Sequence, residues 1–347
     1  MDRNGSPVVG YACSYVPVEI VMAAGFLPVR LVPDARKTGS DGYLHPNTCP
    51  YVKGLLADAG EGSYSGMDAV ILANSCDAMR RLHDLWDAYV KEPTALFLDV
   101  PRKKDRDSVA LFASGLRNLY EHLSGLGGGR GVSPEGLNAS IRQVNSVRSA
   151  YRDLFHAQRD PDKPVRGSVA FSLIQDGALL DPPGFRDRVS RLIRDGKTRC
   201  SKGGKRIFLA GNALNSPELI AVIEAAGVAV VGIDTCFGLR NVQMDVEEDT
   251  PDPFVAIARR YLCRHACPRM TGLGEQVDSL VAMAKDVGAD GVVLSKVKFC
   301  DGLTYNIPAF QAALTDAGMG CLVLENDCGW SDIEKVRIKV ETFLEMG

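Results

Sequence analysis

The sequence lacks the features that mark several large classes of protein. Its 40 basic and 43 acidic residues give a net charge of −3, so it has no basic field of the kind that binds nucleic acid. It contains no apolar run near the roughly 18 residues that cross a bilayer, and its first residues lack the basic-then-apolar plan of a signal peptide. We therefore expect a cytoplasmic protein that binds neither nucleic acid nor membrane.

The cysteines do not follow a disulfide or zinc pattern. The chain has ten of them among 347 residues, and a reducing compartment does not favour structural disulfides. A structural zinc site normally includes a pair of cysteines two to four residues apart. The close pair here is Cys263 and Cys267, with His265 between them, and the sequence offers no second half of such a site. Zinc is therefore disfavoured.

What remains is the composition of a globular protein, 46% hydrophobic and 24% charged. Short aliphatic runs alternate with helical patterns, which indicates βα units and parallel sheets. Strands are expected at 8–11, 28–32, 69–73, 95–100, 206–210, 228–233, 291–295 and 321–325. We predict two doubly wound α/β domains, Rossmann-like or flavodoxin-like, over residues 1–165 and 166–347. Each would have a mainly parallel sheet of about four strands.

Helical periodicity also marks several segments. Helices are expected at 17–24, 77–89, 107–123, 134–155, 217–227 and 252–262. In the second of these, Met79, Leu82, Trp86 and Tyr89 share one face. Ser216 is expected to be the N-cap of the fifth, with Pro217 at its first position.

Three cysteines lie where predicted strands run out into polar turns. Cys49 and Cys76 belong to the first predicted domain, and Cys300 belongs to the second. In open α/β sheets such turns form the ligand crevice at the carboxyl ends of the strands. Thiolates gathered there would suit an iron–sulfur cluster. Alternatively the three are unrelated, because an unlinked cysteine packs as a small hydrophobe.

Other cysteines remain open to more than one interpretation. Cys13 and Cys236 also follow predicted strands, so they line the same crevice or act as extra ligands. Cys200 is expected in a surface loop, and Cys321 in the core of a strand. The sequence does not assign roles to Cys263 and Cys267.

Matched segments along nearly the whole chain resemble a known family. They are 11–20, 23–30, 47–51, 74–82, 234–236 with 238 and 240, 252–253, 260–262, 267, 290–292 and 298–301. Together they resemble the 2-hydroxyacyl-CoA dehydratase D-component family, which includes benzoyl-CoA reductase subunits. The resemblance implies an iron–sulfur subunit that catalyses low-potential, one-electron (ketyl radical) chemistry on an acyl-CoA thioester under anaerobic conditions.

The resemblance also implies a site and partners. A 4Fe–4S cluster would be bound by Cys49, Cys76 and Cys300, leaving one iron open to substrate. The partners would be an acyl-CoA substrate, a related second subunit or a second copy of the chain, and an ATP-dependent iron–sulfur activator protein.

Two further residues are candidates for catalysis. Glu19, at the start of the first predicted helix, would exchange a proton with the leaving group. Its alternative role is a first-turn glutamate favoured by the helix dipole. Ser14 would hydrogen-bond to the substrate.

Three alternative functions stay open. One is a double-cubane reductase of small molecules, which needs about six cysteines and would use Cys13, Cys236 and Cys267 as its second set. Another is a non-catalytic, cluster-bearing subunit that relays electrons. The last is a flavodoxin-like binding module without a cluster. The sequence identifies neither the acyl group nor the residues that bind CoA.

Overall fold

A computed structural model describes most of the chain, in two compact units. The described residues are 6–33, 40–127, 134–175, 182–195, 198, 200, 204–265, 267–328 and 333–346. The first unit comprises Met1–Val147 and Met244–Arg264, and the second comprises Arg148–Gln243 and His265–Gly347. The units are thus discontinuous in sequence, whereas the prediction divides the chain once, at residue 165; that division stays a prediction.

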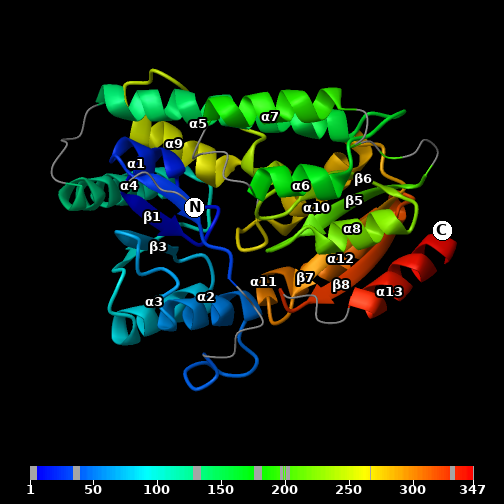
Figure 1. Cartoon of the computed structure of the whole chain (residues 1–347), viewed down its shortest axis with the longest axis horizontal. Coiled ribbons are helices and arrows are strands. Elements are labelled where there is room, and N and C mark those ends of the chain that lie inside the picture. Colours follow the sequence, from blue (N-terminus) through cyan, green and yellow to red (C-terminus); the bar gives the residue numbers. More distant parts are fainter. Residues whose placement is uncertain are drawn as a thin grey trace. The chain divides into compact units, whose positions relative to one another are not determined.

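The first unit is built on a four-stranded parallel sheet. Its strands are β1 (Val8–Tyr11), β2 (Leu27–Arg30), β3 (Ala69–Ala73) and β4 (Ala95–Leu98), in the order β2-β1-β3-β4. Helices α1 (Val18–Ala23) and α4 (Arg106–Leu126) cover one face, and α2 (Pro50–Gly60) and α3 (Asp77–Tyr89) cover the other (Figure 1). All five residues of β3 are buried, as expected for a strand covered on both faces.

Two more helices complete this unit. Helix α9 (Pro253–Cys263) packs on α4, where the rings of Tyr120 and Phe254 meet edge to face at 6.0 Å. Helix α5 (Pro134–Gln158) contributes its first half. On it, the Asn145 amide donates to the Val246 carbonyl at 2.8 Å and accepts from the Val246 N–H at 3.0 Å. These contacts fix the returning segment to a unit far away in sequence.

The second unit repeats the same sheet plan. Its strands are β5 (Arg206–Gly211), β6 (Ala229–Asp234), β7 (Gly291–Val297) and β8 (Gly320–Asn326), in the order β6-β5-β7-β8 and all parallel. One face is covered by α6 (Gly167–Gln175), α8 (Glu218–Ala225) and α13 (Ile333–Met346) (Figure 1). The other face is covered by α10 (Leu273–Asp286) and α12 (Ile307–Asp316), which bury Leu280, Phe310 and Leu314 against β5 and β7.

Among its described residues, the second unit also contains three short or peripheral helices. They are α7 (Pro182–Arg194), the 3₁₀ turn η2 (Leu239–Asn241) and α11 (Asp301–Thr304). The last two directly follow the ends of β6 and β7. Among the described residues, no helix combines the length and the apolar character that a membrane crossing requires.

The predicted fold class is confirmed, because both sheets are four-stranded and entirely parallel, with helices between successive strands. The predicted limits of β1, β3 and α3 coincide with the observed ones. One local prediction is wrong. The N-cap of α8 is Pro217, because the first helical hydrogen bond runs from the Ala221 N–H to the Pro217 carbonyl at 2.9 Å. Tyr89, the last residue of α3, is 61% exposed, and its ring centroid lies 4.7 Å from that of Tyr43 with the ring planes tilted by 49°.

Candidate functional site

Each sheet has one position where ligands of open α/β proteins bind. Along the strand order β2-β1-β3-β4, the chain moves from β1 to β2 in one direction and from β2 to β3 in the opposite direction, so the switch point of the first unit lies between β1 and β3. The loop after β1 carries Cys13 and Ser14, and the loop after β3 carries Cys76. In the second unit the same argument selects β5 and β7, and the turn after β7 carries Cys300.

The three cysteines predicted to bind a cluster share one structural role. Cys49, Cys76 and Cys300 are the N-cap residues of α2, α3 and α11. Cys76 and Cys300 are equivalent, since each follows the third strand of its own sheet. Cys76 is exposed, and the other two are partly exposed. The N-termini of α2 and α3 carry partial positive charge, which favours negatively charged groups beside them.

The turn that carries Cys300 is strained and well fixed. Phe299, directly before it, has φ +58° and is 44% exposed. A left-handed conformation costs a residue with a side chain about 1–2 kcal/mol, and such strain is concentrated at functional sites. On either side, the Lys298 N–H donates to the Asn326 carbonyl at 2.8 Å, and the Thr304 hydroxyl donates to the Cys300 carbonyl at 2.8 Å. The fold therefore maintains an unfavourable backbone geometry next to this thiol.

The convergence of the three thiols stays a prediction, because the first unit holds Cys49 and Cys76 while the second holds Cys300. Within the described residues of either unit taken alone, no three histidine, cysteine, aspartate or glutamate side chains form a metal-ligand group. A site built from these three cysteines thus requires both units.

The predicted catalytic residues, Glu19 and Ser14, are held by α9. Glu19 is fully buried, and the Tyr261 hydroxyl donates to its Oε2 at 2.8 Å. The Arg264 guanidinium donates to the carbonyl and the hydroxyl of Ser14 at 2.9 and 3.0 Å. It also lies over the Tyr15 ring, 4.6 Å from the centroid. The loop from β1 to α1 is therefore fixed by side chains more than two hundred residues away.

Sequence reasoning did not assign Tyr261 and Arg264 to the site. Both are almost completely buried, yet an arginine at the end of a helix ordinarily suggests a solvated position. The signal that could have found them is their three-residue spacing, which places both side chains on one face of α9. The electrostatic effect of Glu19 also reaches Tyr11. Burial raises the pKa of the Tyr11 phenol, Arg30 lowers it and the Glu19 charge raises it further, so the net shift is upward.

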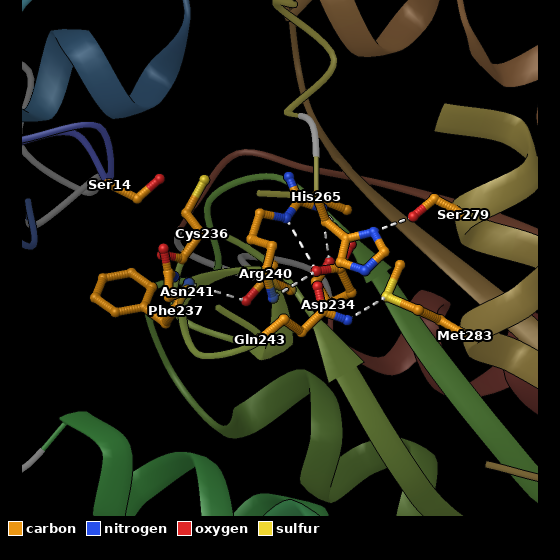
Figure 2. Close-up of polar contacts among 12 residues, drawn as sticks. Ser14, Asp234, Cys236, Phe237, Arg240, Asn241, Gln243, His265, Ser279 and Met283 are labelled. Carbon is orange, nitrogen blue, oxygen red and sulfur yellow. Dashed lines mark hydrogen bonds and ion pairs between the residues drawn. The ribbon is translucent and has the colours of Figure 1, made fainter. Parts of the chain in front are cut away.

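A buried ion pair fixes the turn after β6 (Figure 2). Asp234 and Arg240 are 5% and 4% exposed. The Arg240 guanidinium donates to both carboxylate oxygens of Asp234, at 3.0 and 2.7 Å, and to the Gly211 carbonyl at 2.9 Å. Inside this turn, a Cβ on Gly238 would lie 2.1 Å from the Ile233 carbonyl oxygen, so the close backbone approach requires glycine.

This ion pair lies near two of the cysteines. Burial lowers the pKa of Arg240, but Asp234 raises it, as do the thiols of Cys267 and Cys236, and the net shift is upward. Both thiols thus lie within electrostatic range of one buried cation. The Asn241 amide donates to the Cys236 carbonyl at 2.5 Å (Figure 2), so the backbone that carries Cys236 is fixed as well.

A small cavity adjoins the ion pair. It measures about 30 Å³ and is lined by Asp234, Arg240, His265 and Ser279, among others. The Ser279 hydroxyl contacts Nδ1 of His265 (Figure 2). Its walls combine these polar groups with apolar side chains such as Leu280 and Phe310, and its volume is enough for one water molecule.

Two other cysteines are poor candidates for ligands. Burial and the Glu224 charge raise the pKa of Cys200 and Arg166 lowers it, and the net effect is a pKa of about 11. Burial in β8 raises the pKa of Cys321 to about 11. The surroundings of both thiols therefore disfavour the thiolate form that a metal ligand takes. Cys200 was expected in a surface loop, but it is only partly exposed, with its sulfur 4.0 Å from Glu224.

The fold and these sites together define a class: a parallel α/β protein of two similar sheets, with cysteines in the turns after the strands. Residues 13–346 match the family described as 2-hydroxyglutaryl-CoA dehydratase, D-component. The chain belongs to this family, which confirms the resemblance inferred from its motifs.

Individual relatives are similar over most of their length. The chain is 22% identical over 352 residues to the (R)-phenyllactyl-CoA dehydratase beta subunit of Clostridium sporogenes, covering 99% of this chain and 93% of the relative. It is 24% identical over 352 residues to the lactoyl-CoA dehydratase beta subunit of Anaerotignum propionicum, covering 99% and 92%. It is 24% identical over 307 residues to a benzoyl-CoA reductase subunit of Thauera aromatica, covering 85% and 78%.

Proposed function

We propose that this protein is the iron–sulfur subunit of a 2-hydroxyacyl-CoA dehydratase or a benzoyl-CoA reductase-like enzyme, acting in the cytoplasm. The observation that carries the proposal is the family match over residues 13–346, combined with three cysteines that each begin a helix after a sheet strand. Relatives named as dehydratase beta subunits and as a reductase subunit support the same class of substrate, an acyl-CoA thioester.

Cys49, Cys76 and Cys300 are the residues that would hold a 4Fe–4S cluster. Three thiols that are not fully buried, in turns at helix N-termini, are a donor set that fits thiolate ligation of iron. When bound, the cluster would supply low-potential one-electron transfer and an iron site for an oxygen of the substrate. The chain itself would supply the partial positive charge at the start of α2 and α3, which favours the anionic ligands.

Glu19 would exchange a proton with the leaving 2-hydroxyl group, while Ser14 would hydrogen-bond to the substrate. The contacts that support this role are internal to the first unit. Tyr261 orients the Glu19 carboxyl at 2.8 Å, and Arg264 holds both the backbone and the hydroxyl of Ser14. Glu19 is fully buried, so its carboxyl is oriented by Tyr261 rather than by solvent.

The proposed reaction also requires partners. Three of the relatives are named as beta subunits, which supports a related second subunit; a second copy of this chain would be the alternative. An ATP-dependent iron–sulfur activator would supply the electron that converts the thioester carbonyl into a ketyl radical anion, after which the 2-hydroxyl group departs.

A second candidate function is suggested by the surroundings of Arg240. Cys236 and Cys267 both raise the pKa of its guanidinium, so two members of a possible second ligand set lie within electrostatic range of one buried cation. With Cys13 they would provide the additional thiols that a double-cubane reductase requires. That function predicts about eight irons per chain, and the leading one predicts about four.

The test of the proposed function is turnover. The chain is purified without oxygen together with its partner subunit, then supplied with the activator, ATP and, in turn, lactoyl-CoA, phenyllactyl-CoA, 2-hydroxyglutaryl-CoA and benzoyl-CoA. We expect loss of water or ring reduction for at least one thioester. Glu19→Gln, which keeps the shape but cannot exchange the proton, should lower the rate by about 100-fold or more.

The matched control is Glu218→Gln, which changes a glutamate in the first turn of another helix, α8. It should leave turnover unchanged. If no thioester reacts although the protein contains its full iron complement, the acyl-CoA function is wrong. If Glu19→Gln turns over at the wild-type rate, Glu19 has only a structural role.

A further inference from the structure

A second cavity lies in the second unit, beside the turn that follows β6. It measures about 180 Å³ and is formed by the last two turns of α5, the edge strand β6, η2 and α10. Its walls are mainly apolar. They include Phe155, Val231, Leu239, Val242, Met283 and Val287. This volume is close to that of an engineered apolar cavity, about 150 Å³, that binds benzene.

The cavity also has a basic wall. Arg152, His156 and Arg159 line it from α5, and their spacing of four and seven residues places all three on one face of that helix. Asp286 from α10 is the carboxylate among the lining residues, and Arg159 forms an ion pair with it. The lining therefore includes two guanidinium groups and one carboxylate.

Hydrogen bonds hold the charged groups in place. Arg152 donates to the Val242 carbonyl at 2.7 Å. Nη2 of Arg159 also lies 2.5 Å from Nδ1 of His156. Gln243 donates to the Met283 sulfur at 3.3 Å (Figure 2), which orients an otherwise flexible wall.

The backbone around the cavity is fixed independently. The Arg206 guanidinium donates to the carbonyls of Arg159 and Val287 at 2.8 Å each, so it ties the end of α5 to the end of α10. In β6, the register with β5 shifts so that the pairing skips Val231. This bulge lies on an edge strand, and bulges of this kind are common beside binding sites. The cavity is therefore a preorganised feature of the unit.

We propose that this cavity binds a small organic monocarboxylate, with its hydrocarbon body against the apolar walls and its carboxylate against Arg159 and Arg152. Guanidinium groups pair well with carboxylates. An inorganic anion would be surrounded mostly by hydrocarbon, and a neutral apolar molecule would leave the basic wall unused. Benzoate matches both the volume and the charge.

The proposal is tested by isothermal titration calorimetry on the anaerobically purified full-length chain, with benzoate as the probe. Benzyl alcohol, of similar shape without charge, and inorganic phosphate, charged without a hydrocarbon body, serve as comparison ligands. We expect benzoate to bind more tightly than either. Arg159→Gln should weaken benzoate about tenfold or more, because it removes a charge-assisted bond.

Two further variants complete the experiment. Leu239→Trp should block the cavity and abolish binding while keeping the charges. Arg142→Gln changes an arginine on the same helix, ion-paired with Asp249 outside the cavity, and should bind benzoate like the wild type. Absence of benzoate binding to the wild type, equal binding of phosphate, or unchanged affinity in both Arg159→Gln and Leu239→Trp would overturn the proposal. None of these results bears on the acyl-CoA function, since the assay contains no thioester.

Discussion

At the scale of single residues, the site depends on buried polar pairs that come from distant parts of the sequence. Glu19 and Tyr261 form one pair, and Asp234 and Arg240 form another. Removing the partner of a buried carboxylate destabilises the folded protein by up to the full desolvation penalty of that group. Each pair therefore holds a loop at the end of a strand in one conformation, and that conformation presents the neighbouring Ser14 or Cys236.

The Glu19–Tyr261 contact gives a direct prediction. Tyr261→Phe removes the hydrogen bond to a fully buried carboxyl while keeping the ring. We expect a loss of about 1–3 kcal/mol in the free energy of unfolding, measured by urea titration at equal iron content. The matched control is Tyr305→Phe, since Tyr305 is 79% exposed, and its change should stay within about 0.5 kcal/mol. Equal stability of the two variants would mean that the Tyr261 hydroxyl does not support Glu19.

At the scale of elements, the strands and the turns after them can be predicted from the sequence, whereas contacts between distant segments cannot. The strands themselves follow from aliphatic runs such as Ala69–Ala73, which hydrophobic burial on both faces explains. The cysteine turns follow from where those runs stop. The spacing of Tyr261 and Arg264 indicates a shared face, but the partners of these side chains could not be predicted, because the segment that carries α9 joins the first unit through long-range contacts such as packing on α4 and the hydrogen bonds of Asn145 to Val246. Such long-range contacts leave no periodic pattern in the sequence.

The close approach of β5 to β7 provides an element-scale prediction. Gly211 has φ +154°, and a Cβ there would lie 2.0 Å from the Ser295 carbonyl oxygen. Gly211→Ala must therefore push the two strands apart at the end that faces the Cys300 turn. We expect it to lower the free energy of unfolding by about 2–4 kcal/mol.

The control for this prediction is Gly274→Ala in α10, where a Cβ meets no atom within 4 Å. It should be neutral or stabilise the protein by up to about 1 kcal/mol. If both alanine variants unfold at the same urea concentration, the strand contact at Gly211 does not limit stability.

At the scale of the whole molecule, the chain contains one plan twice. Both sheets place their first strand between the second and the third, and both begin a helix with a cysteine after the third strand. The sequence predicts this architecture because local patterns determine each βα unit. It does not predict that Met244–Arg264 belongs with the first unit, since the local sequence pattern of a helix does not indicate which unit the helix packs against.

The central claim is that Cys49, Cys76 and Cys300 bind one cluster. The most direct measurement is the iron and acid-labile sulfide content of anaerobically purified protein, for the wild type, for each single cysteine-to-alanine variant and for the control Cys321→Ala, whose thiol pKa is raised to about 11. We predict about four irons per chain in the wild type and in the control, and a loss of most of the iron in each of the other three variants. Full iron content in all three would contradict the claim.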